Sequence, residues 1–412
     1  MRNPSLLLAA FVTLGTAACA PSPRLELRPD DAQLADTIIT RSTSITLQAT
    51  NRASAGLTID SAPRTGDRGG DLREDLVQAR AQHTLVAQQL SAQLRINPTG
   101  PQQLTLAKRQ TTNAAAYQLY LKGRYFWNQR SGESYARAIP FFEQAIQADP
   151  NFALAYAGLA DVYVLRDDAQ MGFRVAKDKA VALTQQALRL DSTLAEAHAT
   201  LAFAAFMYDW NWRQAETDFQ QALALNPNYA TAHHWYAEYL MTQGRFDEAL
   251  AEIKLAQELD PLSPAISMDI GVYRYFAHRF DAAISQLQQT AQLHPDFADL
   301  PDVHSWLANA YEQQGAYERT VQEYLLYKNL IHSPEAEIKL LQQGFQENGI
   351  TGLRRAKLAI LQQKLQRGVP VRAVSVAHQH AMLGETDAAM EWLEKAYTEH
   401  HYGLTYLKVD PR

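Results

Sequence analysis

Apolar and polar positions repeat with a period of 34 residues in the middle of the chain. Residues 230–263 and 264–297 are each 34 residues long, and the second segment repeats the first with substitutions. The matched positions are Arg245-Phe246-Asp247 with Arg279-Phe280-Asp281, Ala249 with Ala283, Ile253 with Leu287, and Pro261 with Pro295. A period of this length is typical of a solenoid of helix-turn-helix repeats.

The same spacing extends over most of the chain. Small residues recur where two helices approach closely, larger apolar residues fill the layers between helices, and a proline ends the second helix. We therefore predict an all-α, right-handed helical solenoid over residues 113–412. Its expected units are 113–152, 153–194, 195–229, 230–263, 264–297, 301–333, a degenerate helix pair at 334–368, and 370–403.

The region before the solenoid follows a different pattern. Leu72, Leu76, Val86, Leu90 and Leu94 keep helical spacing, which predicts connecting helices within 71–112. Alternating apolar residues at 44–49 predict a strand, with 56–59 as its weak partner, so this small irregular segment is expected to hold a short hairpin. A helix is expected over 31–41 and a glycine-rich loop over 61–70.

Composition and charge exclude some classes of function. Hydrophobic residues make up 47% of the 412 residues and charged residues 20%, which indicates a well-packed protein rather than a disordered one. The formal net charge of -6 does not suit a nucleic-acid surface, which needs a basic face. We therefore expect no nucleic-acid partner.

Cys19 is the only cysteine, and it follows a basic start, an apolar run at 6–14 and small residues at 15–18. This order predicts a signal peptide over 1–18. The position of Cys19 resembles the lipobox of bacterial lipoproteins, which implies lipid attachment at Cys19 and an extracytoplasmic, membrane-anchored protein. A cleaved signal with an incidental thiol and a short uncleaved anchor are the alternatives. Residues 19–70 would then hold the lipidated Cys, a linker and the irregular segment.

Residues 115–412 resemble one bacterial class of tetratricopeptide repeat arrays. Such arrays follow TolB-like regions in membrane-anchored winged-helix regulators, adenylate cyclases and receptor-type kinases. The likeness rests on residues 116–128, 153–163, 208–212 and 229–240, with 392–397 and 407–412 similar to the end-group of those arrays. Residues 71–96 are similar to the helix that joins the TolB-like part to the array. The resemblance implies a fold and a binding role, and it implies no enzymatic activity.

Motifs for chemistry are missing from the sequence: it has no P-loop, nucleophile elbow, zinc-protease or EF-hand pattern. The adjacent pairs His233-His234 and His400-His401 would diverge by about 100° on a helix, so they do not predict a shared metal ion. Carboxylates such as Glu248 and Glu252 are expected on solvated helix faces. We expect no catalytic residue, no metal and no cofactor.

The segment Asp209-Trp210-Asn211-Trp212 allows two interpretations. It could be an aromatic shelf for a ligand. It could equally be a helix-helix turn, capped by Asp209 or Asn211, whose tryptophans pack on neighbouring repeats.

The family resemblance also implies which residues face the concave groove of the solenoid, at five fixed positions of each first helix. The candidates are Tyr117, Tyr120, Arg124, Trp127, Phe203, Phe206, Met207, Met268, Val272, Tyr275 and Phe276. Only Arg124 among them has the basic chemistry that would clamp a partner's carboxylate. An aromatic and methionine-rich groove suits an amphipathic helix or an extended apolar peptide. Packing of these side chains against 72–94 or against the C-terminal tail is the alternative.

These observations predict a non-catalytic scaffold that binds an unidentified protein or peptide and touches the membrane only through its N-terminal lipid. A sensor or regulatory remnant acting through residues 31–60 is a second interpretation. An enzyme of unrecognised type is the third.

Overall fold

The computed structural model describes residues 111–165, 172–295, 297 and 300–412, together with the backbone of three strands near the N-terminus. Cys19, the signal peptide, the helix expected over 31–41, the loop at 61–70 and nearly all of the connecting segment 71–112 lie outside the described residues. The described helices divide into two units. One unit contains residues 111–121 and 144–152, and the other contains 122–143 and 153–412.

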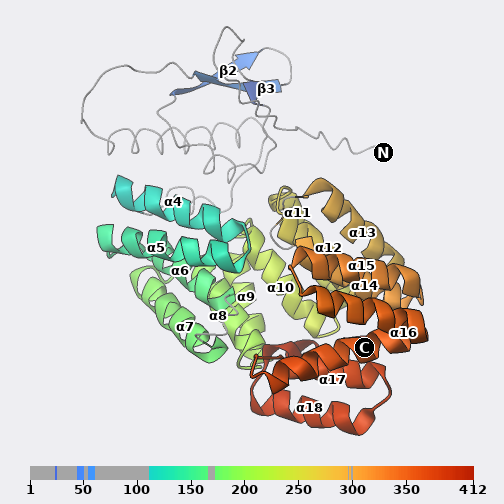
Figure 1. Cartoon of the computed structure of the whole chain (residues 1–412). Helices are drawn as coiled ribbons and strands as arrows, with labels where there is room; N and C mark the ends of the chain where they lie inside the picture. Colours follow the sequence, from blue (N-terminus) through green and yellow to red (C-terminus); the bar gives the residue numbers. More distant parts are fainter. Residues whose placement is uncertain are drawn as a thin grey trace. The chain divides into compact units, whose positions relative to one another are not determined.

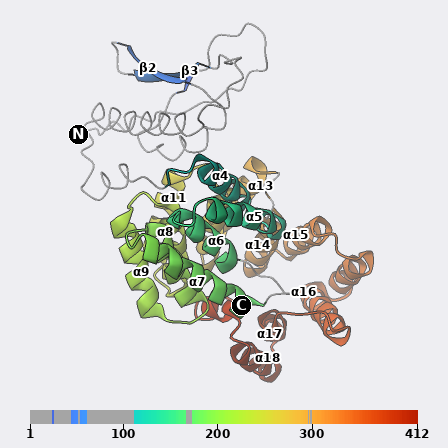
Figure 2. The ribbon, with the colours of Figure 1, turned by 90° about the vertical axis from the view of Figure 1, so that its left-hand side faces the viewer.

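The expected all-α array is confirmed: fifteen α-helices follow one another between residues 114 and 398 of the described chain. Consecutive helices pair with each other, and from α6 to α15 the pairs follow one another in space in sequence order (Figures 1 and 2). The helices are α4 (Ala114–Asn128), α5 (Gly132–Ala148), α6 (Ala153–Leu165), α7 (Phe173–Leu190), α8 (Ala195–Met207), α9 (Trp212–Leu225), α10 (Ala230–Thr242), α11 (Phe246–Leu259), α12 (Pro264–Phe276), α13 (Phe280–Leu293), α14 (Leu300–Gln313), α15 (Tyr317–Leu330), α16 (Glu335–Gln366), α17 (Ala373–Met382) and α18 (Thr386–Thr398).

The 34-residue period is visible in the helix bounds themselves. Both ends of α12 and α13 lie 34 residues after the corresponding ends of α10 and α11. The turn inside each pair needs one residue in the left-handed region. Glycine fills this place at 244, 315 and 384, whereas His278 fills it at a φ of 58°.

Small residues allow the close helix packing that the pattern predicts. The ring of Phe142 lies so close to Gly123 and Gly158 that a Cβ on either glycine would come within 2.7 or 2.5 Å of it. Ala249, Ala283 and Ala389 occupy the same place in three different repeats, and all three are buried. Side chains larger than a methyl group would separate the helices at these positions.

First and second helices of a repeat differ in burial. Every residue of α10 except Glu238 is buried, whereas α11 buries only Ala249, Ile253 and Ala256. The difference arises because first helices contact the first helices on both sides as well as their own partners.

The degenerate pair consists of two helices that meet at a kink. Within α16, Asn348 and Gly349 have non-helical backbone angles, and the backbones of Gly344 and Gly352 approach each other closely. Glycine is required at this crossing because a Cβ on Gly352 would lie 1.8 Å from the Gly344 carbonyl oxygen. The last repeat, α17 and α18, follows.

The N-terminal strands form an antiparallel sheet. Strand β2 (Ser44–Thr50) pairs with β3 (Ser54–Asp60), with Ser44 opposite Asp60 and Thr50 opposite Ser54. The short β1 (Arg24–Leu25) lies on the other side of β3, so the strand order is β1-β3-β2. The structure thus has a hairpin at the place where the alternation of residues 44–49 predicted one.

After α18 the chain forms the 3-10 helix η1 (Tyr402–Tyr406) and ends at Arg412. We call residues 402–412 the C-terminal segment. It does not continue the stack of helices but returns to α8, the first helix of the third repeat. This return places it on the surface where the candidate functional residues lie.

Candidate functional site

The first helices α6, α8, α10, α12 and α14 lie side by side and together define what we call the first-helix face. The ninth position of each repeat shows its chemistry, because this position holds a residue of different character in each helix. These residues are Arg124 in α4, where Gly123 is taken as the small residue of position 8, then Asp161, Phe203, Glu238, Val272 and Asn309.

Tyr117 and Tyr120 lie at the beginning of α4 and are half-buried. Their rings stack on each other at 6.3 Å, and the Tyr120 ring meets Phe152 edge-on at 5.3 Å. Asn113 caps this helix by accepting a hydrogen bond from the Ala116 backbone N–H at 3.1 Å. Both tyrosines therefore occupy defined positions while still reaching solvent.

Trp127 lies between two guanidinium groups. The Cζ atoms of Arg124 and Arg130 are 3.9 and 3.6 Å from its ring centroid. The indole is almost completely buried, and its Nε1–H lacks a hydrogen-bond partner. In such cation–π contacts, a positively charged group is attracted to the face of an aromatic ring.

Asp161 is the buried carboxylate opposite Arg124. It accepts hydrogen bonds from Arg124 Nη1 at 2.9 Å and from the Thr200 hydroxyl at 2.6 Å. Burial raises the pKa of Asp161, while the Arg124 charge and the Thr200 hydrogen bond act in the opposite direction. The pair joins α4, α6 and α8 through one charged network.

Phe203, Phe206 and Met207 of α8 are all buried. The Phe203 ring lies 4.8 Å from that of Trp235 in α10 and 5.2 Å from that of Phe206. These side chains contact one another more than they contact solvent, so they contribute to the cohesion between neighbouring repeats.

The candidates of α12 differ from one another in burial. Met268 is half-buried, whereas Tyr275 and Phe276 are fully buried and meet Trp306 of α14 at 5.4 and 5.5 Å. Val272 is buried between them. Their role as partner contacts remains a prediction.

The C-terminal segment lies on this same face and contacts four of the first helices. Thr405 donates a hydrogen bond to the Met207 carbonyl of α8, and Tyr406 donates one to Glu238 of α10. The Tyr406 ring also stacks on Phe276 of α12 at 5.7 Å, and the Arg412 guanidinium lies 6.0 Å from the Trp306 ring of α14. The sequence left open whether the groove candidates pack against the C-terminal tail. At Met207 and Phe276 the structure shows this packing.

Glu238 is the most unusual group on the first-helix face. Burial and the Asp269 charge raise the pKa of its carboxyl, the Tyr406 hydrogen bond and the Arg130 charge lower it, and the resulting pKa is about 7. The hydroxyl of Tyr273 lies in the same electrostatic environment, is buried, and has no hydrogen-bond partner among the described residues. His234 donates to or accepts from Asp269 at 2.7 Å.

Asp161 and Glu238 are absent from the sequence-based candidates, although a signal for them exists. They occupy position 9 of the second and fourth repeats, which is the position of Arg124 in the first and of Phe203 in the third. Applying the inward-facing positions to every repeat would have found both acids. Tyr406 lies outside the repeats and has no such signal.

The histidine pairs diverge as the helical geometry predicts. His233 contacts Glu252 at 2.6 Å and the Pro227 carbonyl at 2.8 Å, whereas His234 turns to Asp269. Glu248, the other member of the acidic pair, binds Arg245 instead. In the parts of the chain that the structure describes, no group of three or more His, Cys, Asp or Glu is arranged to hold a metal ion.

Asp209-Trp210-Asn211-Trp212 forms the turn between α8 and α9. Asn211 caps α9 by accepting a hydrogen bond from the Gln214 backbone N–H, and Asp209 pairs with Lys177 at 2.8 Å. The turn interpretation expected Trp210 to pack on neighbouring repeats. Trp210 stacks on Tyr397 and His400 of the last repeat.

Over the described residues, no helix has both the length and the apolar character needed to cross a membrane.

Comparison with known proteins gives a family match over part of the chain. The model of the tetratricopeptide repeat matches residues 201–264 and 268–330. The transcriptional regulator HilA of Salmonella typhimurium is 26% identical over 169 residues, which is 40% of this chain and 30% of that protein. The chain thus spans less than a third of the length of this curated relative.

Solved structures give similar matches at low identity. PilF of Pseudomonas aeruginosa is 18% identical, with 63% of this chain and 96% of that chain covered and a TM-score of 0.37. A structure of human IFIT1, a dimer with PPP-AAAA, is 16% identical, with 79% of each chain covered and a TM-score of 0.47. The family model and the matched helix bounds agree over α8–α15, and this chain carries tetratricopeptide repeats.

Proposed function

We propose that the protein is a non-catalytic scaffold that binds a segment of a partner protein on its first-helix face. The observation that carries this proposal is the C-terminal segment, because it is itself a short peptide segment, folded as η1 and a turn, that is held on that face. It is bound through an aromatic stack on Phe276, a backbone acceptor in α8 and a buried carboxyl in α10. Tetratricopeptide arrays present such surfaces for peptide recognition.

The chemistry of the face suggests what the partner segment carries. The half-buried Met268 offers thioether surface, and the Arg124 and Arg130 guanidinium groups lie over the buried Trp127 ring. The partner segment would contribute aromatic or long apolar side chains.

The proposal includes the compartment. The order of residues 1–19 supports export and lipid attachment at Cys19, which would present the repeats outside the cytoplasm on a membrane. The net charge of -6 supports a protein partner rather than a nucleic acid. Labelling with radioactive palmitate should mark the wild-type protein and not Cys19→Ser, and an unlabelled wild type would refute the anchor.

The binding face is tested by photocrosslinking. A photoreactive residue at Met268, which is half-buried, should capture a protein from envelope fractions. The same residue at Leu262, which is 70% exposed in the connection between α11 and α12, is the matched control. Equal capture from Leu262 would mean that the first-helix face is not the binding site.

A further inference from the structure

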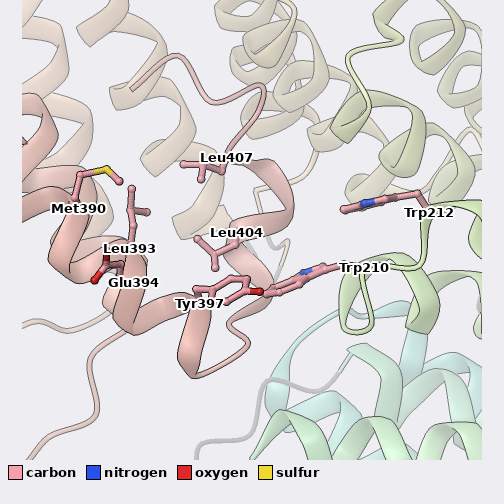
Figure 3. Close-up of a pocket in the computed structure, with 8 residues that line it drawn as sticks. All are labelled: Trp210, Trp212, Met390, Leu393, Glu394, Tyr397, Leu404 and Leu407. Atoms are coloured by element: carbon pink, nitrogen blue, oxygen red, sulfur yellow. The ribbon is translucent and has the colours of Figure 1, made fainter.

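A second surface of the molecule is apolar and open. It lies between the turn before α9 and the last repeat, and Figure 3 shows side chains of both elements facing a common space. Its volume is about 460 Å³. We call it the apolar trough, and its lining residues are Trp210, Trp212, Met390, Leu393, Glu394, Tyr397, Leu404 and Leu407.

One end of the trough is held in a fixed arrangement. Trp210 occupies the left-handed place of the helix-pair turn, with a φ of 52°, where the pairs α10–α11, α14–α15 and α17–α18 use glycine. Its ring stacks on Tyr397 at 5.6 Å and on His400 at 4.8 Å, both nearly parallel. An aromatic residue in this backbone conformation is costly, and these stacking contacts compensate for part of that cost.

The trough leaves large apolar side chains in solvent. Met390, Tyr397 and Leu407 are 52%, 64% and 49% exposed. Leu404 and Leu407 of the C-terminal segment line one side of the trough, while Thr405 and Tyr406 of the same segment bind α8 and α10. A contiguous apolar surface of this kind marks an interaction site more often than single exposed residues do.

Helix α18 carries three exposed acidic residues beside the trough. Asp387, Glu391 and Glu394 lie at i, i+4 and i+7 on α18, so they form one exposed stripe alongside Met390 and Tyr397. Glu394 is the one residue among those that line the trough with a carboxylate side chain. The base on α18, Lys395, lies 4.6 Å from the Trp392 ring on another side of the helix. On the opposite wall, Arg213 follows Trp212 in the sequence.

We propose that the apolar trough is a docking site for an amphipathic helix of a partner protein that carries Leu- or Met-type side chains flanked by Lys or Arg. The apolar stripe of such a helix would cover Met390, Leu393 and Tyr397, and its bases would lie along the acidic stripe of α18. This site is separate from the first-helix face and goes beyond the function proposed above.

The test uses the full-length protein and two synthetic helical peptides. Both carry the same leucine face, which is flanked by lysines in one peptide and by glutamates in the other. In isothermal titration calorimetry the lysine peptide should bind at least about tenfold more tightly than the glutamate peptide. Met390→Asp should weaken its binding by about tenfold or more, because it places a carboxylate in the apolar stripe.

Leu262→Asp is the matched control, since Leu262 is even more exposed but lies far from the trough in sequence. It should bind the lysine peptide like the wild type. Replacing Glu391 and Glu394 together by lysine should reverse the preference between the two peptides. Circular dichroism should confirm that every variant, altered only at exposed positions, keeps the helical fold.

Several outcomes would overturn the proposal. They are equal affinity for both peptides, equal weakening by Leu262→Asp, and hydrogen-exchange protection by the lysine peptide on α10 and α12 rather than on residues 390–407. Binding to anionic lipid vesicles that Met390→Asp abolishes, with no binding of either peptide, would assign the trough to a membrane surface instead. None of these outcomes bears on crosslinking from Met268.

Discussion

The helix pairs α10–α11 and α17–α18 have the same design but different surroundings. Both have a glycine in the left-handed turn, at 244 and 384, and a buried alanine five residues later, at 249 and 389. In the middle of the array α10 buries every residue except Glu238 and α11 buries three, whereas at the end α17 buries five of its ten residues and α18 buries only Ala389 and Ala396. The neighbours of a repeat, more than its own sequence, decide how much of it is covered.

The difference also extends to position 9 of the two repeats. Glu238 occupies it in α10 and binds Tyr406, and His378 occupies it in α17 and lies 3.3 Å from Asp410. The C-terminal segment thus supplies a polar partner for position 9 of both pairs. Burial and the Arg412 charge lower the pKa of His378 to about 4, while Asp410 acts in the opposite direction.

The largest effect is expected from Ala249→Arg, which places a charged side chain between α10 and α11. It should lower the free energy of unfolding by about 3 kcal/mol or more, because the helices must separate and a charge is buried. Ala389→Arg, with fewer neighbours, should cost about 1–2 kcal/mol. Urea denaturation measures both, and an unchanged curve for Ala249→Arg would mean that the repeat register is wrong.

The two residues at position 9 should give opposite pH dependences. Glu238 has a raised pKa of about 7 in the fold, so the native state holds a proton that the unfolded state releases above its own pKa of 4.5. Its contribution to stability is therefore present at low pH and is lost as the pH rises through about 7. Between pH 5 and 8 the wild type should lose about 2–3 kcal/mol relative to Glu238→Gln.

For His378 the sign is reversed, because its pKa falls from 6.5 to about 4 in the fold. The unfolded state then binds the additional proton, so stability is lost as the pH falls from about 6.5 toward 4. Relative to His378→Gln, the wild type should lose about 2 kcal/mol over that range. For either residue, parallel pH profiles of the wild type and the variant would contradict the structure. They would mean that the pKa of that side chain is the same in the folded and unfolded states.

A smaller contrast separates two tyrosines. Tyr406→Phe removes the hydrogen bond to the buried Glu238 carboxyl and should cost about 1–2 kcal/mol. Tyr397→Phe, at a site that is 64% exposed, should change stability by less than about 0.5 kcal/mol. Thermal unfolding of both variants at pH 6 measures the difference. If the two variants melt alike, the C-terminal segment is not held by Tyr406.

The smallest effect is expected at an exposed ion pair. Arg279 donates to Asp247 at 2.7 Å, but the two side chains are 52% and 91% exposed. Arg279→Ala should therefore change the free energy of unfolding by less than about 1 kcal/mol. A loss above that in urea denaturation would indicate that this pair, which joins two neighbouring repeats, matters more than surface pairs do.

Much of the helical fold is predictable from particular residues. The repeated Arg-Phe-Asp, the alanines at 249 and 283 and the prolines at 261 and 295 are consistent with the bounds of α10–α13, because each residue marks a turn or a close helix contact. The hairpin near residue 44 follows from simple alternation.

The site is less predictable, for two physical reasons. Aromatic residues at inward positions, such as Phe206 and Tyr275, have the same chemistry whether they bind a partner or pack on each other. Contacts between distant segments carry no periodic signal at all. Tyr406 meets Glu238 across 168 residues, and Trp210 meets Tyr397 across a similar distance.

The attachment of the C-terminal segment has a consequence for how the array folds. Repeat arrays normally unfold piecemeal, since each repeat contacts only its neighbours and the ends fray first. Here Thr405 is bound to a carbonyl 198 residues earlier, so the last repeat cannot detach without disturbing α8, α10 and α12. Such a long-range closure raises the contact order and couples the repeats between its ends. We expect the repeats from α8 to α18 to unfold as one cooperative unit. We also expect them to fold more slowly than an open array of equal length.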